Sequence, residues 1–234
     1  MTPAELKYHV LLGVDKHFEN AAPGYNDIQM SAILNKAQRR VFKKYRELFD
    51  RDEKVRKILS PVLSRGSLLE ADIIKSNDNT YTHPNGWFYA LPEGTAYLVE
   101  EYVTLDLGTN PATYSDPVLV YPITYDYYVK NYKNRYKKPH TDLVWRLEAG
   151  YENEDELYVV ELITDGVYEI YDYFIVYLRY PTDIIVDITG VEETPCEIVD
   201  QGFHDEIVSE AIKIIVAALN DEGYQVAAAE RTFD

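Results

Sequence analysis

The hydrophobic period changes twice along this chain of 234 residues, and that change limits the folds open to it. In residues 26–48, apolar side chains recur every three or four positions, which is the period of an α-helix with one buried face. From about residue 68 to 190, short runs rich in Val, Ile and Tyr are separated by Asn, Gly and Pro, as in strands and turns. Helical periodicity returns at residues 203–219. Helices, then strands, then a helix predict an α+β fold.

Capping signals position the expected helices. Thr2-Pro3-Ala4-Glu5 is a complete helix start, with an N-cap threonine, proline at the first position and glutamate at the third. Asn26, followed by Gln29, caps the second helix, and a third short helix is expected at 52–59. We expect one further helix inside the strand-rich region, capped by Thr124 and ending near residue 139.

The expected strands lie at residues 67–75, 87–91, 96–107, 142–148, 156–164 and 167–180. Asp165-Gly166 stands between the last two runs and predicts a β-hairpin, because this dipeptide tolerates positive φ. We therefore expect an N-terminal helical region at 1–66 and a β-rich, sandwich-like body with one inserted helix at 67–190. A C-terminal helix and tail at 191–234 are expected to join the N-terminal helices in one assembled domain.

Charge is unevenly distributed over the chain, whose net value is −17. Residues 151–234 hold 21 acidic and 3 basic side chains, whereas residues 1–150 hold 19 acidic and 20 basic ones. This distribution argues against DNA wrapping by the whole molecule. It suits a surface that faces a basic partner, or a pore wall that must not grip DNA.

Tyrosine is abundant, with 22 residues against 7 phenylalanines. Tyrosine is typical of surfaces buried between chains, because it offers a large contact area and a polar end. It is also favoured in strands, where many of these tyrosines fall. Both interpretations stay open from the sequence.

Sequence motifs for common chemistry are absent. The chain has no phosphate-binding glycine loop, no GxSxG elbow, no HExxH, no CxxC and no EF-hand loop. Its five histidines, at positions 9, 17, 83, 140 and 204, lack the close spacing of a zinc site. A single cysteine excludes an internal disulfide framework, no run is long and apolar enough to span a membrane, and the first ten residues do not resemble a signal peptide. No catalytic, cofactor or metal site is predicted.

Cys196, His204, Asp205 and Glu206 form the one group whose residue types suggest chemistry. No local signature brings the thiol and the imidazole together as nucleophile and base, so a hydrolase is the weakest hypothesis. As structural residues they are easily explained: Cys196 is a small apolar residue, and the carboxylates lie in the first turn of a helix, where its macrodipole favours them. We interpret the stretch as the attachment of a C-terminal helix.

Two basic stretches are candidates for contact with nucleic acid or with another subunit. The first is the polar face of the second helix, with Lys36, Arg39, Arg40, Lys43 and Lys44. The second interleaves cations with aromatics, as single-strand binders do, in Lys130, Tyr132, Lys133, Arg135, Tyr136, Lys137 and Lys138. The alternatives are a solvated face or a surface that docks on the acidic part of a neighbouring copy, which we prefer because the chain carries its own complementary charge.

Four stretches together resemble a known family. They are "YNDIQMSAILNKAQRRVFKKYRE", "VYPITYDYYVKNYKNRYKKPHTDLVWRLE", "LRYPTDIIVDI" and "CEIVDQGFHDEIVSEAIKI". In this order they are similar to the ring proteins that build the neck and tail barrel of crAss-like phages. Asp126-Tyr127 departs from the family, which often has Asp-Glu there, and "NRYKKP" replaces the family's "NPFKKP".

The resemblance implies a virion structural protein without enzymatic activity or cofactor. It implies a ring of about twelve copies, matching the symmetry of the portal, beneath the portal and among other ring proteins. Double-stranded DNA would pass through the channel, and assembly would take place in the cytoplasm of the host bacterium, without a membrane. The alternative from another class is a phage nucleic-acid-binding accessory protein that uses the two basic stretches.

Overall fold

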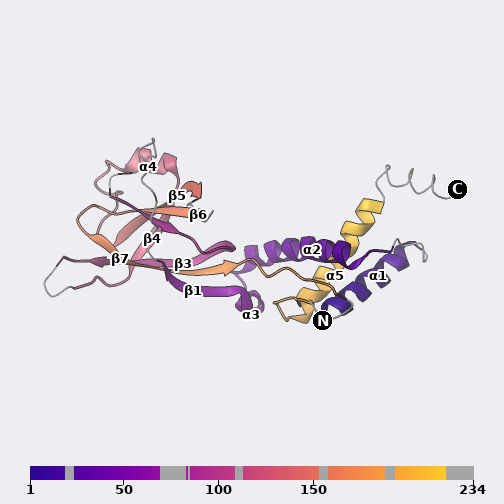
Figure 1. Ribbon diagram of the computed structural model, residues 1–234. Helices are drawn as coiled ribbons and strands as arrows, with labels where there is room; N and C mark the ends of the chain where they lie inside the picture. The colour runs from indigo at the N-terminus through magenta and orange to yellow at the C-terminus, as the bar shows by residue number, and fades with distance from the viewer. Residues whose placement is uncertain are drawn as a thin grey trace. The chain divides into compact units, whose positions relative to one another are not determined.

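The computed structural model describes residues 1–18, 24–68, 83, 85–108, 113–152, 158–187 and 193–219 (Figure 1). The chain divides into two compact units. We call them the helical unit, drawn from Met1–Val62 and Tyr180–Asp234, and the sheet unit, Leu63–Arg179. The expected α+β class is confirmed, with N-terminal helices, a strand-rich centre and a C-terminal helix.

The helical unit contains α1 (Pro3–Phe18), α2 (Asp27–Leu48), α3 (Glu53–Ile58), the 3-10 turn η1 (Ser60–Val62) and α5 (Gln201–Leu219). The predicted caps are confirmed. Thr2 and Glu5 exchange side-chain hydrogen bonds with each other's backbone N–H, and Asn26 and Gln29 form a capping box. Asp52 accepts from the backbone of Lys54 at the start of α3.

The core of the helical unit lies where α5 packs against α1 and α2 (Figure 1). Its buried side chains follow the helical period predicted from the sequence, and α1 approaches α5 closely where Gly13 faces Ile212. The three helices contribute Leu6, Val10 and Val14, then Met30, Leu34, Ala37 and Val41, then Ile207, Ala211 and Ile215.

An extended segment, residues 182–186, is held along α2 by polar side chains of that helix. Asn35 Nδ2 donates to the carbonyl of Ile184 at 3.0 Å, while the N–H of Ile184 donates to Asn35 Oδ1 at 2.6 Å. Gln38 donates to the carbonyl of Thr182 at 2.9 Å, and Ser31 accepts from Val186 at 2.9 Å. These bonds satisfy backbone groups that would otherwise be buried without a partner.

The sheet unit contains one seven-stranded sheet in the order β1-β7-β3-β4-β5-β6-β2. Its strands are β1 (Leu63–Leu68), β2 (Gly86–Ala90), β3 (Thr95–Asp106), β4 (Val118–Ile123), β5 (Leu143–Glu152), β6 (Tyr158–Ile163) and β7 (Glu169–Arg179). All neighbours are antiparallel except β4 and β5, which are parallel and are joined through α4 (Tyr125–Asn131).

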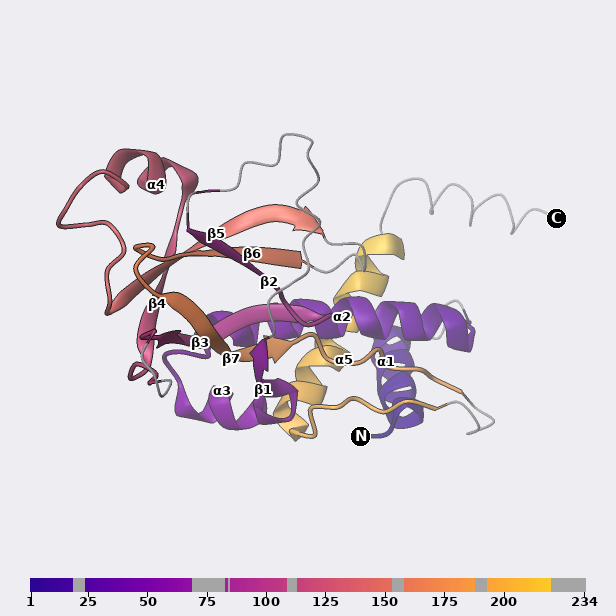
Figure 2. The same ribbon diagram turned by 60° about the vertical axis from the view of Figure 1, so that its left-hand side comes forward.

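The sheet curls around its larger buried cluster, so one sheet produces the sandwich-like body (Figure 2). Tyr89 of β2, near one end of the sheet, belongs to the same buried cluster as Tyr173 of β7, near the other end. The two rings lie 5.1 Å apart. On the opposite face of β5, Trp145 is covered by Tyr127 and Tyr128 of α4.

The hairpin predicted at Asp165-Gly166 is wrong. β6 pairs with β2 and β5, whereas β7 pairs with β1 and β3. Gly166 does adopt a positive φ of 81°, as the dipeptide suggested. The turn therefore bends the chain, but β7 continues on the other side of the curled sheet, because a turn signal specifies local backbone geometry and not the strand partner.

Two other predictions in the sheet unit are wrong. The inserted helix begins after Thr124 as predicted, but α4 ends at Asn131 and turns follow to residue 138. Asn side chains end it: Asn131 Nδ2 donates to the carbonyl of Tyr127 at 2.9 Å, and Asn134 Oδ1 accepts from the N–H of Tyr136 at 3.0 Å. The strand β4 was not predicted. Of the strand predicted at 67–75, residues 69–75 lie outside the described residues, as does the tail at 220–234.

Candidate interaction surfaces

The side chains of Cys196 and His204 are buried. Cys196 and His204 are 6% and 2% exposed, and His204 Nδ1 lies 2.8 Å from the backbone nitrogen of Met1. Burial raises the pKa of the Cys196 thiol to about 11 and lowers the pKa of His204. Asp200 starts α5 by accepting from the N–H of Phe203 at 2.9 Å. A protonated, buried thiol is a poor nucleophile, so the geometry supports the structural interpretation.

Within the described ranges, no group of three or more His, Cys, Asp or Glu side chains is arranged to hold a metal ion. The prediction that Asp205 and Glu206 lie in the first turn of the helix is wrong, because α5 already begins at Gln201 and its first turn holds no acid. Asp205 accepts from Gln201, and Glu206 accepts from Lys44 and Tyr45 of α2. Glu206 therefore fastens α5 to α2, whereas the bond of Asp205 lies within α5 itself.

The basic face of α2 meets acids of the same unit. Arg40 donates to Glu210 at 2.8 Å and Lys44 to Glu206 at 2.7 Å, both across the contact with α5. Arg39 lies 3.2 Å from the carboxylate of Asp183. Three of the five candidate cations on α2 are thus paired inside the chain.

The same contact shifts the pKa values of two side chains. Burial, together with the hydrogen bond to Glu206, raises the pKa of Tyr45 to about 12. The hydrogen bond from Arg40 lowers the pKa of Glu210. The polar contact between α2 and α5 therefore has electrostatic consequences that can be measured.

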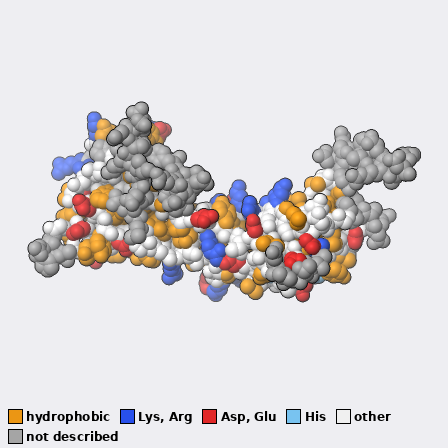
Figure 3. Space-filling model, viewed as in Figure 1, with side chains coloured by type: hydrophobic (Ala, Val, Ile, Leu, Met, Phe, Trp, Pro, Cys, Tyr) orange, Lys and Arg blue, Asp and Glu red, His pale blue; other side chains and the backbone are white. Residues whose placement is uncertain are grey.

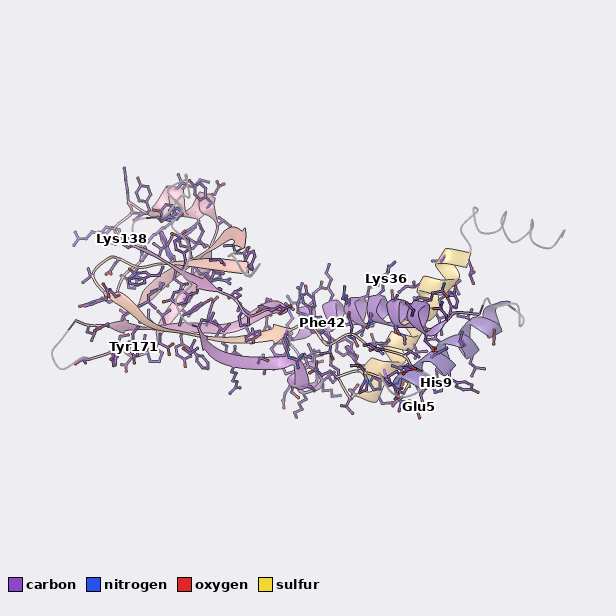
Figure 4. All side chains as sticks on the ribbon, viewed as in Figure 1. Glu5, His9, Lys36, Phe42, Lys138 and Tyr171 are labelled. Carbon is purple, nitrogen blue, oxygen red and sulfur yellow. The ribbon has the colours of Figure 1, made fainter. Side chains whose placement is uncertain are left out.

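Lys36 and Lys43 are the other two candidates on α2. Both are exposed, and neither has an ion-pair partner among the residues that the structure describes. Figure 4 labels Lys36 on α2, and Figure 3 shows Lys and Arg side chains along that helix.

The second basic stretch lies in the sheet unit and is unpaired. Its five cations are exposed, and none has an ion-pair partner in the described part of the chain: Lys130, Lys133, Arg135, Lys137 and Lys138. Tyr136 is 92% exposed, and the ammonium of Lys133 lies 5.2 Å from the centre of the Tyr132 ring. Figure 4 labels Lys138 at the end of the sheet unit that carries α4, where Figure 3 shows blue side chains.

Apolar side chains that sequence reasoning missed extend this stretch. Leu119 and Tyr121 of β4 and Tyr125 and Val129 of α4 are between 49% and 60% exposed. A signal was present, because residues 118–121 form a short continuous apolar run, but a helix was expected to begin directly after this segment. We call the whole set the tyrosine–lysine surface: Leu119, Tyr121, Tyr125, Val129, Tyr132, Tyr136 and the five cations of residues 130–138.

Aromatic contacts support this surface from beneath. The rings of Tyr128 and Tyr132 stack at 5.4 Å, and His83 meets Tyr128 edge-on at 4.1 Å. His83 is itself fixed, because its ring and its backbone N–H both contact the carboxylate of Glu161, at 2.7 and 3.0 Å. Glu161 is 1% exposed, so the support reaches into the core of the sheet unit.

Comparison with known proteins identifies the family. The model of the family described as phage tail ring protein 3/4 matches residues 6–226 of the chain. The chain belongs to this family. It is also similar to "Ring protein 4/5" of Bacteroides phage crAss001, with 28% identity over 219 residues, covering 85% of each chain. The resemblance expected from the four sequence stretches is confirmed.

Membership of the phage tail ring proteins gives the quoted stretches a physical meaning. "NKAQ", Asn35 to Gln38, and "YPTDI", Tyr180 to Ile184, bind each other through the Asn35 and Gln38 side chains. The closing stretch supplies Glu206 and Glu210 to the first one. Three of the four stretches therefore contribute to the helical unit, and the fourth forms β4, α4 and β5 of the sheet unit. In the described part of the chain, no helix has the length and apolar character needed to cross a membrane.

Proposed function

We propose that this chain is the subunit of a cyclic ring in the neck or tail of a phage particle, as a head-to-tail connector or a component of the tail barrel. The observation that carries the proposal is the match of a phage tail ring family to residues 6–226. The proposed ring contains about twelve copies, to match the portal symmetry that the resemblance implies, and it closes because the rotation per head-to-tail contact divides the circle. It surrounds the channel through which double-stranded DNA passes.

The ring docks on the portal or on other ring proteins of the neck and tail, and it is assembled in the cytoplasm of the host bacterium without a membrane. Its role is structural and not enzymatic, and it needs no cofactor. Two features favour such a subunit. Its charge is strongly segregated along the chain, and it exposes tyrosines of the kind that dominate contacts between proteins.

Cryo-electron microscopy of the intact particle tests the proposal. We expect cyclic density at the neck or tail into which both units fit. Particles whose neck and tail contain no ring of this chain would refute the structural role. Because closure and docking add contacts that a single pair lacks, a monomer in dilute solution is compatible with the proposal.

A nucleic-acid-binding accessory protein is the second candidate. It is favoured by the unpaired cations and interleaved tyrosines of residues 130–138. On that hypothesis the purified chain binds DNA with a steep dependence on salt, because each phosphate contact releases counterions. A weak and shallow salt dependence argues against it.

A further inference from the structure

The fold of the sheet unit does not explain why the tyrosine–lysine surface exposes so many apolar and charged side chains. Its six large apolar side chains fall within residues 119–136, and each is between 43% and 92% exposed. Single exposed apolar residues are normal, but a continuous group of them marks a contact surface. Three of these tyrosines contact the partly buried rings beneath them: Tyr121 lies 6.5 Å from Tyr127, and Tyr125 and Tyr132 lie 6.5 and 5.4 Å from Tyr128.

Backbone hydrogen bonds and ring contacts order part of this surface. The N–H groups of Lys137 and Lys138 both donate to the carbonyl of Asn134, at 3.0 and 2.9 Å, so the turns after α4 are fixed. The stack of Tyr128 on Tyr132 rests on the pair of His83 and Glu161 described above. A preformed surface loses less conformational entropy when it binds than a mobile one does.

Charge identifies the partner. Residues 130–138 contain five cations and no acid, whereas the whole chain carries −17, so its other residues together carry −22. The cations Arg40 and Lys44 of α2 show what happens when acids of this chain are within reach, because both are paired. The cations of residues 130–138 find no such partner in the described part of their own chain.

We propose that the tyrosine–lysine surface is a subunit interface and that its occupant is an acidic surface of a second copy of this chain. The inference rests on the proposed ring and names one of its two contact surfaces. A second copy carries an excess of acids, because the net charge of the chain is −17. It can also cover Leu119, Val129 and the tyrosine rings, which phosphates of a DNA duplex would leave exposed to water.

The test is self-association of the purified full-length chain, measured by sedimentation over a range of salt concentrations. We compare the wild type with the double variant Arg135→Glu/Lys137→Glu and with Tyr132→Ser/Tyr136→Ser. Lys36→Glu/Lys43→Glu on α2 is the matched control, since it changes the charge of the chain by the same amount at exposed residues. Circular dichroism confirms that every variant folds.

We expect wild-type association to weaken with salt, because the contact pairs opposite charges. Each variant of the tyrosine–lysine surface should raise the dissociation constant at least about tenfold, and the α2 control should change it less than about twofold. Variants of the surface that associate like the wild type overturn the inference. So does a wild-type chain that stays monomeric at low salt up to its solubility limit.

Binding of a DNA duplex, followed by fluorescence anisotropy, separates the remaining alternative. If Arg135→Glu/Lys137→Glu loses duplex binding but keeps self-association, the surface contacts nucleic acid and the inference is wrong. A different experiment tests the proposed ring itself, namely the search for cyclic density in the particle. A ring in the particle with unchanged association of the surface variants would refute this interface alone.

Discussion

Substitution of Asn35 by alanine tests how α2 holds the extended segment 182–186. The side chain makes two hydrogen bonds, to the carbonyl and to the N–H of Ile184, and Ile184 is fully buried. Asn35→Ala leaves both backbone groups without these partners, at a cost of about 1–3 kcal/mol each where water does not replace them. Alanine regains up to about 0.7 kcal/mol as a better helix former. We expect a net loss of about 1–5 kcal/mol in the free energy of unfolding.

The assay is guanidinium denaturation followed by circular dichroism at a wavelength that reports helix content. Trp87 and Trp145 both lie in the sheet unit, so tryptophan fluorescence recorded in parallel reports that unit. Lys36→Ala, at the next position and exposed, is the control, with an expected change within about 0.5 kcal/mol. If Asn35→Ala changes the free energy as little as the control does, the two hydrogen bonds do not fix this segment.

Three further predictions concern other contacts. Gly86→Ala should destabilise the sheet unit by about 1–3 kcal/mol, because a Cβ at this position overlaps the Glu161 carboxylate that holds His83. Denaturation followed by tryptophan fluorescence measures the loss, and unchanged stability would contradict this packing. At pH 8 the Cys196 thiol of the folded chain should react with a disulfide reagent at least about a hundredfold more slowly than the thiol of the unfolded chain, because folding raises its pKa from 9.0 to about 11. Fast reaction of the folded chain would contradict this and show an accessible thiolate. Arg40→Ala and Lys44→Ala should each cost less than about 1 kcal/mol, because the two side chains are 52% and 61% exposed, and high salt should shrink the loss. Because the pKa of Glu210 is lowered, its ion pair with Arg40 stabilises the fold fully above the ordinary pKa of 4.5, and this stabilisation should disappear as the pH falls through the lowered pKa. An Arg40→Ala loss above about 2 kcal/mol, or one independent of pH and salt, would refute this assignment.

The sequence predicts those elements whose stability is decided locally. α1, α2 and α3 begin directly after their capping residues, and the buried face of α2 follows the 3.6-residue period. α4 was predicted too long, because Asn131 and Asn134 compete for its backbone through hydrogen bonds that periodicity does not reveal. β4 was missed because its apolar run is short and merges with the start of that helix.

Strand pairing is decided by distant parts of the chain, and this is where the sequence was least informative. β6 is buried at five consecutive positions, Val159 to Ile163, as expected for a strand covered on both faces and not for an exposed hairpin. A turn at Asp165-Gly166 is compatible with either arrangement. Curling of the sheet, which brings Tyr89 and Tyr173 together, depends on contacts among all its strands.

The two basic stretches look alike in the sequence, but their surroundings in the structure differ. Part of this difference could be predicted from the sequence. Arg40 and Lys44 are four residues apart on one helix, and Glu206 and Glu210 are four residues apart on another. Two helices that pack in opposite directions bring such pairs into register, Arg40 with Glu210 and Lys44 with Glu206, as observed. Acids also occur on the elements that support residues 130–138, for example Asp126 on α4 and Glu148 on β5, but no ion pair joins them to these cations in the described part of the chain. A charged segment that its own fold does not neutralise keeps its charge available for another molecule, and the tyrosines beside it make a protein surface the better fit.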